Sequence, residues 1–156
     1  AQRALSREFE SRRVDKRYVA LLDGSVAPDS GVISLPLRLD VDRRPYQIVD
    51  FVHGKEAVTQ FEVLTRTQGS TRVRFEPITG RTHQLRVHAA TPPLAFESDA
   101  ARREDQSPGG LGCPIAGDPL YGTRAPGARL ALHAEWMAFN DPTTGERVEF
   151  RSASPF

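Results

Sequence analysis

Alternation of apolar and polar residues predicts most of the secondary structure of this chain. Residues 16–23, closed by Gly24, have the pattern of a strand, and so do residues 57–64 and 71–77. Gly69 and Ser70 lie between the latter two segments, which favours an antiparallel hairpin. Further extended segments are expected at residues 31–37, 130–139 and 147–151. Pro36 should keep the first of these out of the centre of a sheet.

Two short helices complete the predicted elements. Residues 1–13 carry Leu5 and Phe9 at helical spacing, and residues 83–90 form the second candidate. No capping residue precedes the first helix, so the chain is expected to begin inside an element. Strands dominate, which predicts an α+β domain: a largely antiparallel mixed β-sheet with a few short helices.

Residues 91–111 interrupt this pattern. They are rich in Pro, Gly, Ser and charged residues and have almost nothing to bury. We therefore expect an exposed, mobile insertion. Because no linker or internal repeat is visible, residues 1–156 are predicted to form a single domain.

Composition excludes several classes of protein. The chain has 156 residues, of which 38% are hydrophobic and 26% charged, as expected for one soluble globular domain. No apolar run approaches the roughly 20 residues of a membrane helix. The single cysteine, Cys113, excludes an internal disulfide and fits a reducing cytoplasm. Because the net charge is only +1, any basic surface must be local.

The most informative stretch is residues 79–88, Thr-Gly-Arg-Thr-His-Gln-Leu-Arg-Val-His. It joins a strand to a helix through a Thr/Gly turn, so backbone N–H groups should gather at the helix start near Arg81, His83 and Arg86. This predicts an anion site, with a nucleic-acid phosphate as first candidate. A solvated helix start with a core-facing side is an equally good interpretation. Tyr18 is similarly open, because a strand tyrosine is usually half-buried packing.

Other chemistries have little support. His83 and His88 are five residues apart and do not share a helix face, and His53, Cys113 and His133 are scattered, so no metal site is predicted. The nucleotide-binding glycine loops and the Gly-x-Ser-x-Gly elbow do not occur. Residues 117–122 (Gly-Asp-Pro-Leu-Tyr-Gly) resemble a turn capped by Asp118.

Taken together, six blocks resemble the catalytic domain of the RluA-type pseudouridine synthases. They are residues 16–20, 31–37, 57–64, 77–88, 114–122 and 132–135. The similarity runs over the whole chain. The block at residues 79–88, combined with Gly-Asp-x-x-Tyr-Gly at 117–122, is its most specific part.

The resemblance implies an enzyme that isomerises uridine to pseudouridine in structured RNA, ribosomal or transfer RNA or both. It implies no metal and no organic cofactor, a cytoplasmic location and a monomer. Tyr18 would stack on the extruded base and help remove its C5 proton. Arg86 would pair with a nucleophilic aspartate, and Leu85 would form the apolar wall of the pocket. The residues expected to hold RNA phosphates are Arg81, Thr82, His83, Gln84, Lys16 and Arg17.

One departure from the family pattern changes the expectation for this chain. The nucleophile belongs to a His-Arg-Leu-Asp block, which does not occur here, and Asp15, Asp23 and Asp40 lack its context. We expect the block to lie upstream of Ala1, the domain to be N-terminally incomplete, and the chain alone to be inactive. The alternative is a catalytically inactive RNA-binding relic of the same fold. An enzyme for a non-RNA phosphate ligand is disfavoured, since no nucleotide loop is present.

Overall fold

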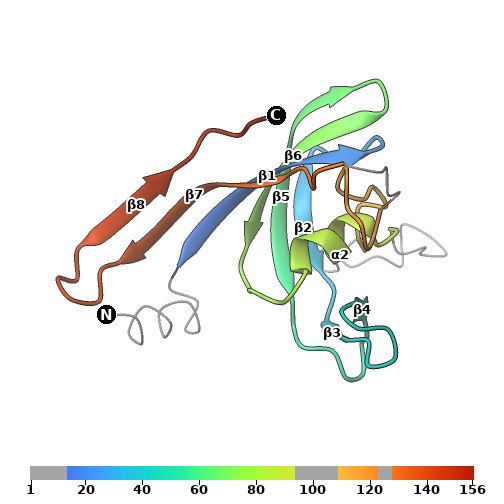
Figure 1. Ribbon diagram of the computed structural model, residues 1–156, viewed down its shortest axis with the longest axis horizontal. Helices are drawn as coiled ribbons and strands as arrows, with labels where there is room; N and C mark the ends of the chain where they lie inside the picture. Colours follow the sequence, from blue (N-terminus) through green and yellow to red (C-terminus); the bar gives the residue numbers. More distant parts are fainter. Residues whose placement is uncertain (1–13, 94–108, 123–127) are drawn as a thin grey trace, which may run out of the picture.

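A computed structural model describes residues 14–93, 109–122 and 128–156, and its main element is a six-stranded antiparallel sheet (Figure 1). The strand order is β2-β5-β6-β1-β7-β8. The strands of this sheet are β1 (Asp15–Asp23), β2 (Ser30–Ser34), β5 (Val58–Thr67), β6 (Ser70–Pro77), β7 (Leu132–Asn140) and β8 (Arg147–Arg151). A separate hairpin joins β3 (Leu37–Leu39) to β4 (Gln47–Val49), and helix α2 spans Gln84–Ala90.

The strand predictions agree with these elements, including the β5–β6 hairpin, whose turn contains Gly69 at φ 87°. The expected extended segment at 31–37 is the exception, because it divides into β2 and β3, which belong to different sheets. Pro36 lies between them, where its missing N–H removes no ladder bond, and its carbonyl accepts the Asp50 amide. The helix expected at residues 1–13 lies outside the described residues.

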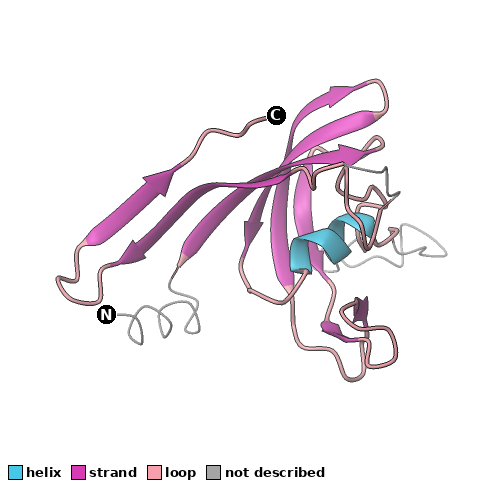
Figure 2. Cartoon of the chain, viewed as in Figure 1, coloured by secondary structure: helices cyan, strands magenta, loops and turns pink. Residues whose placement is uncertain are grey.

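The hydrophobic core lies between one face of the sheet and a cover made of α2 and residues 109–116 (Figure 2). Leu22, Ile33 and Phe75 contribute fully buried side chains from the sheet. Ile115 bridges to Leu22, and Leu85 adds the contact from α2. Burying each such side chain contributes roughly 1.5–3 kcal/mol, which anchors a helix too short to be stable alone.

The cover corrects the expected bounds of the exposed insertion at 91–111. Gly109, Gly110 and Leu111 are buried, and Leu111 N–H donates to the His88 carbonyl at the end of α2. A Cβ on Gly110 would lie 2.1 Å from the Thr91 carbonyl oxygen, so only glycine fits there. The sequence suggested almost nothing to bury because only Leu111 adds an apolar side chain here, and the rest of this packing uses backbone. The intervening residues 94–108 lie outside the described part of the chain.

A β-bulge interrupts the pairing of β1 with β7 beside Tyr18. Arg17 lies opposite Trp136, whereas Tyr18 lies opposite Ala134, so Glu135 is the extra residue. A bulge changes the direction of the side chains around it and increases the local twist.

No helix within the described ranges is long and apolar enough to cross a membrane.

Candidate active site

The loop from β6 to α2 carries the block at residues 79–88, and its backbone is unusual at one position. His83 adopts φ 55° and ψ 16°, the left-handed region, directly before the helix. This conformation costs a non-glycine residue about 1–2 kcal/mol. Its ring Nδ1 lies 2.9 Å from the Tyr121 hydroxyl. A tertiary contact therefore holds a strained residue at the edge of the site, as is common where function fixes geometry.

Gln84 is buried inside this loop, and all of its hydrogen-bonding capacity is used by the protein. Its Oε1 accepts from the Thr79 hydroxyl (2.7 Å) and the Arg81 amide (2.9 Å). Its Nε2 donates to the Val58 carbonyl (3.0 Å) and the Thr59 hydroxyl (2.9 Å). An amide side chain has two N–H donors and an oxygen that can accept two hydrogen bonds, so Gln84 has no donor or acceptor left for RNA. The prediction that Gln84 holds an RNA phosphate is therefore wrong.

His88 continues this internal network from the next turn of α2. It is fully buried, and burial lowers its pKa to about 4, so the ring is neutral at physiological pH. Nε2 lies 3.2 Å from the Leu35 carbonyl, which can only accept, so Nε2 carries the proton. Nδ1 then accepts from the Thr59 hydroxyl at 2.9 Å. We call Thr59, Thr79, Gln84 and His88 the inner network.

These bonds also correct the expected anion site at the helix start. The Arg81 amide is already bound by Gln84, and α2 has only seven residues. The positive character of the junction comes from its side chains instead. The alternative interpretation was right in part, since Leu85, His88 and Ala89 do face the core.

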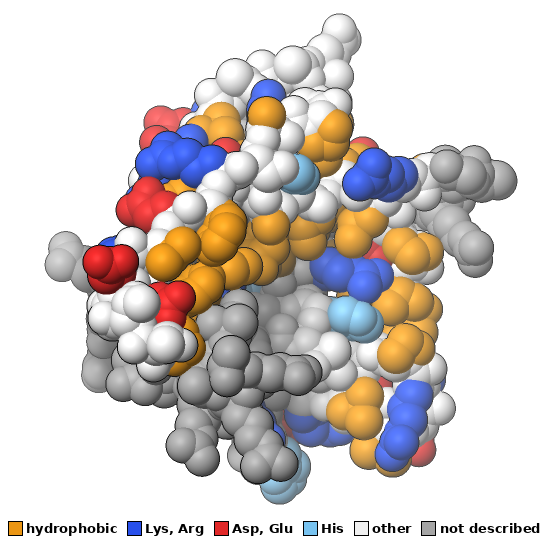
Figure 3. Space-filling model, turned by 60° about the vertical axis from the view of Figure 1, so that its left-hand side comes forward, with side chains coloured by type: hydrophobic (Ala, Val, Ile, Leu, Met, Phe, Trp, Pro, Cys, Tyr) orange, Lys and Arg blue, Asp and Glu red, His pale blue; other side chains and the backbone are white. Residues whose placement is uncertain are grey.

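On the opposite side of the junction, Tyr18, Leu85 and Arg86 line one cavity of about 250 Å³, here called the Tyr18 cavity. The remaining lining residues are Lys16, Pro77, Thr79, Gly80, Arg81, His83, Gln84 and Leu132. No carboxylate of the described residues lines it, whereas three cationic side chains do. The face shown in Figure 3 is hollowed near its middle, with hydrophobic, basic and histidine side chains around the hollow.

Tyr18 enters this cavity from β1. Its side chain is half-buried against the core, and burial raises its pKa, so the hydroxyl is protonated at neutral pH. Leu85, only 7% exposed, supplies an apolar surface from α2. An aromatic ring and an aliphatic wall suit a flat, neutral heterocycle.

Arg86 is held in place by Asp118 from the Gly117–Gly122 turn. Its Nε donates to Oδ2 at 2.9 Å and its Nη2 to Oδ1 at 2.6 Å, a two-point contact that fixes the guanidinium plane. Burial alone would raise the pKa of Asp118, but hydrogen bonds from Arg86 and the Leu120 and Tyr121 amides outweigh it and lower the pKa. Of the five Arg86 N–H bonds, this contact uses two, which leaves donors for a second anion.

Gly117 makes the Asp118 turn possible. It has φ 71°, and a Cβ there would lie 2.3 Å from the Arg129 carbonyl oxygen. Both the conformation and the close approach require glycine. The turn also delivers Tyr121, whose hydroxyl accepts the Gln47 amide at 2.7 Å. That hydroxyl proton is then free to bond His83 Nδ1, which places the proton of a neutral His83 on Nε2.

His83 and Lys16 both have lowered pKa values in this setting. Burial is the main cause for each, and the nearby Arg86 adds to it for His83. Lys16 Nζ lies close to the loop, 3.8 Å from where a Cβ on Gly80 would be. A lowered pKa indicates that the site favours neutral or less charged forms until an anion arrives.

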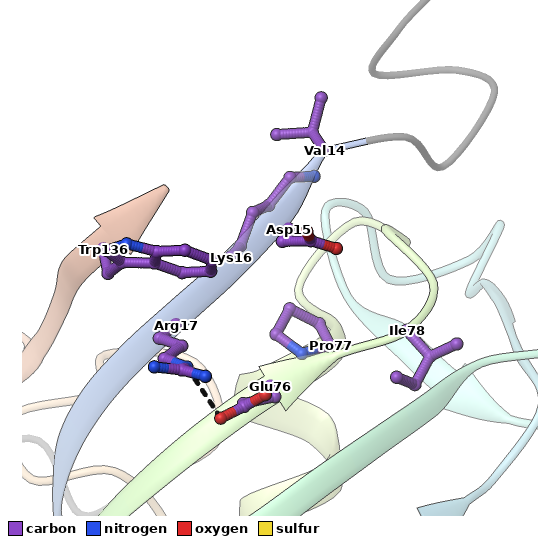
Figure 4. Close-up of a pocket in the computed structure, with 8 residues that line it drawn as sticks. All are labelled: Val14, Asp15, Lys16, Arg17, Glu76, Pro77, Ile78 and Trp136. Carbon is purple, nitrogen blue, oxygen red and sulfur yellow. Dashed lines mark ion pairs between the residues drawn. The ribbon is translucent and has the colours of Figure 1, made fainter. Parts of the chain in front are cut away.

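Arg17 points away from the Tyr18 cavity. It lines a neighbouring hollow of about 240 Å³ with Lys16 and Trp136 (Figure 4). There it pairs with Glu76 at 2.8 Å, and its guanidinium lies 4.7 Å from the centre of the Trp136 ring. Of the predicted phosphate ligands, the structure groups Lys16, Arg81 and His83 with Tyr18, but not Arg17.

Thr82 is exposed and lines a third cavity, of about 660 Å³, between the loop and the β3–β4 hairpin. We call it the hairpin cavity. It shares Gly80, Arg81 and His83 with the Tyr18 cavity. Within the described ranges, no three His, Cys, Asp or Glu side chains are grouped as a metal site would require.

Sequence analysis missed the positioning role of Asp118 and Tyr121. Asp118 was expected only to cap its turn, which it does through the Leu120 and Tyr121 amides. The available signal was the Gly-Asp-x-x-Tyr-Gly block itself, since a turn that begins and ends with glycine and carries an aspartate and a tyrosine is more specific than a surface loop. That Asp118 pairs with Arg86, 32 residues earlier, could not be predicted from the sequence.

Comparisons with known proteins find matches both in sequence and in structure. The family model for RNA pseudouridylate synthase matches residues 1–91. The chain is 40% identical over 160 aligned residues to the dual-specificity RNA pseudouridine synthase RluA of Haemophilus influenzae, covering all of the chain and 64% of that relative. It is 38% identical to RluA of Yersinia pestis, covering 68% of that protein.

A solved structure has the same fold. Human RNA pseudouridylate synthase domain containing 1 superimposes with a TM-score of 0.73 at 31% identity, over 98% of this chain and 60% of that one. The chain thus spans about two thirds of the length of the curated relatives it matches. From the match to the family model, the shared fold and these identities, the chain belongs to the RNA pseudouridylate synthase family and is of the RluA type.

Proposed function

We propose that this chain forms the larger part of the catalytic domain of an enzyme that isomerises uridine to pseudouridine in ribosomal RNA, transfer RNA or both. The observation that carries the proposal is the shared cavity: Tyr18 comes from the block at residues 16–20, Leu85 and Arg86 come from the block at residues 77–88, and all three line one space. The same proposal places the enzyme in the cytoplasm as a monomer.

The reaction is an isomerisation, so uridine and pseudouridine contain the same atoms. The N1–C1′ bond breaks, the uracil turns, and a C5–C1′ bond forms; C5 then loses its proton and N1 gains one. Because a stacked base exposes neither atom, the uridine must leave the helix and enter a pocket. The Tyr18 cavity offers a ring for stacking, an apolar wall and hydrogen-bond donors.

Each residue has a proposed part in this reaction. The Tyr18 ring stacks on uracil, and its hydroxyl, near C5 after rotation, accepts the C5 proton while it passes its own proton to solvent water. Arg86, oriented by Asp118, uses its remaining N–H donors to keep the nucleophilic aspartate of the family ionised and aimed. Lys16, Arg81 and His83 contact the flanking phosphates.

The nucleophile itself is not matched by any aspartate of the printed sequence. We therefore propose that the His-Arg-Leu-Asp block is supplied by a segment encoded ahead of Ala1, and that the 156 residues alone bind RNA without turnover. The relic hypothesis differs only in that the extended polypeptide would also be inactive.

Release of tritium from RNA labelled at C5 of uridine tests the proposal, because forming the C5–C1′ bond expels that hydrogen. Two polypeptides are compared on stem–loop transfer and ribosomal RNA fragments: the 156-residue chain and the product of its gene including the sequence before Ala1. We expect release only from the extended form. RNA binding by both forms with release from neither would favour the relic, and release by the short chain would disprove the assignment of the nucleophile.

A further inference from the structure

The hairpin cavity lies directly beside the Tyr18 cavity and has no role in the proposed chemistry. It is the larger of the two, about 660 Å³ against about 250 Å³. The loop at Gly80–His83 forms the shared wall, and the β3–β4 hairpin and the residues after it form the other side. A chain entering one cavity would pass the other.

The lining of the hairpin cavity is strongly basic. Arg38, Lys55 and Arg81 are cationic, His53 and His83 add two imidazoles, and no carboxylate of the described residues lines it. The charge is partly compensated, because Arg38 pairs with Asp50 just behind the wall. Arg81 donates Nε to the Glu56 carbonyl at 2.9 Å, a bond that orients the guanidinium without neutralising it.

Lys55 is the cation of this cavity that is best placed to meet an anion from outside the protein. Two backbone hydrogen bonds with Leu37 fix its main chain. The Lys55 amide donates to the Leu37 carbonyl at 2.8 Å, and the Leu37 amide donates to the Lys55 carbonyl at 2.9 Å. Its side chain is exposed, and none of the described carboxylates forms an ion pair with it. A cation on a rigid support without a counter-charge is suited to an anion from outside the protein.

The turn that precedes Lys55 is equally well fixed. Asp50 Oδ1 accepts the Val52 and His53 amides at 2.8 and 2.9 Å. Gly54 follows, and a Cβ there would lie 2.2 Å from the Asp50 carbonyl oxygen. His53 and Lys55 therefore stand at the cavity on a turn that does not need to reorganise, which lowers the entropic cost of binding.

The neighbouring hollow of about 240 Å³ that Arg17 and Trp136 line provides an internal comparison. Its lining holds two carboxylates beside the cations Lys16 and Arg17: Arg17 pairs with Glu76, and Asp15 pairs with Arg147. Such compensated charges gain little from a phosphate. The excess of positive charge lies at the hairpin cavity instead.

Building on the proposed function, we propose that the hairpin cavity binds the sugar–phosphate backbone of the RNA strand next to the extruded uridine, with Lys55 contacting a phosphodiester and His53, Arg81 and Thr82 around it. A single strand fits better than a duplex, since the cavity adjoins the pocket into which one nucleotide is drawn. Lysine is a common point-charge ligand of phosphate.

The test is the salt dependence of RNA affinity, measured with the 156-residue chain and a fluorescent stem–loop RNA by anisotropy. Lys55→Gln should lower the slope of log affinity against log salt by about 0.7–0.9 and weaken binding about five- to tenfold at 0.1 M salt. Arg151→Gln is the matched control, because it removes one exposed charge from β8, an edge strand that lines neither cavity and lies apart from α2 and the β3–β4 hairpin (Figure 1). It should change neither quantity.

A neutral methylphosphonate at one loop position of the RNA sharpens the result. The substitution beside the target uridine should weaken binding by the unmodified chain but not by Lys55→Gln. Equal slopes for Lys55→Gln and Arg151→Gln would overturn this inference and leave the proposed function standing. Binding of inorganic phosphate alone with micromolar affinity, lost in Lys55→Gln, would overturn it in favour of a small phosphate ligand. Failure of the unmodified chain to bind any RNA would overturn the proposed function as well.

Discussion

The two sides of the β6–α2 junction are built from the same ten residues and use their polar groups in opposite ways. In the inner network, each polar side-chain atom of Gln84 and His88 has a partner within the protein. On the side of the Tyr18 cavity, Arg86 has one fixed partner and spare donors. The difference shows that, within one block of polar residues, some side chains hold the fold together while others remain available to bind a ligand.

The scaffold half explains how the site half holds its shape. Gln84 ties the loop to β5, and His88 ties α2 to β5 and to the segment before β3. These buried bonds fix the axis of a seven-residue helix whose cavity-facing side carries Arg86. Damage to the inner network should therefore appear as lost stability, and damage to the cavity as lost turnover.

Gln84→Leu should have the largest effect on folding. It removes four hydrogen bonds, leaves the Arg81 amide without its partner and takes one partner from each of the Thr59 and Thr79 hydroxyls, which should lower the free energy of unfolding by about 4 kcal/mol. Chemical denaturation measures the change. Gln60→Leu on the exposed side of β5 is the control and should change it by less than about 0.5 kcal/mol. Equal effects of the two would contradict the scaffold role.

Arg86→Lys should have the next largest effect, on turnover rather than on folding. Lysine keeps the charge but cannot reproduce the two-point contact with Asp118, so the cation is misplaced and turnover of the active polypeptide should fall about 100-fold, or about 2.7 kcal/mol. Arg74→Lys is the matched control, since Arg74 pairs with Glu62 and Glu135 away from the cavity. Turnover that falls equally in both variants would show a general structural effect.

The buried His88 predicts a pH dependence of stability of about 2 kcal/mol. Its pKa is about 4 in the folded protein and near 6.5 when exposed, so the unfolded chain binds more protons between these values. The free energy of unfolding should therefore fall as the pH decreases from about 7.5 to 5. Denaturation of His88→Gln at both pH values should give a smaller decrease by about this amount. An unchanged decrease would mean that another group causes it.

Sequence patterns predicted the sheet well because alternation, turn glycines and proline act locally. Residues 57–64 and 71–77 with Gly69 between them are sufficient to define the β5–β6 hairpin. The site was less accessible, because Arg86 and Asp118 meet only after the chain has crossed the core. Gln84 shows the limit most clearly: its type and its place among basic residues suggested RNA, whereas burial behind β5 made it a structural residue.

The central claim is that the Tyr18 cavity receives the extruded uridine, and Tyr18→Phe tests it most directly. The measurement is tritium release from C5-labelled uridine by the polypeptide extended ahead of Ala1, with RNA affinity measured in parallel. Phenylalanine keeps the stacking ring and loses the hydroxyl, so turnover should fall by about 100-fold or more with affinity nearly unchanged. Tyr46→Phe, outside the cavity, should retain full turnover. Full turnover by Tyr18→Phe would contradict the account.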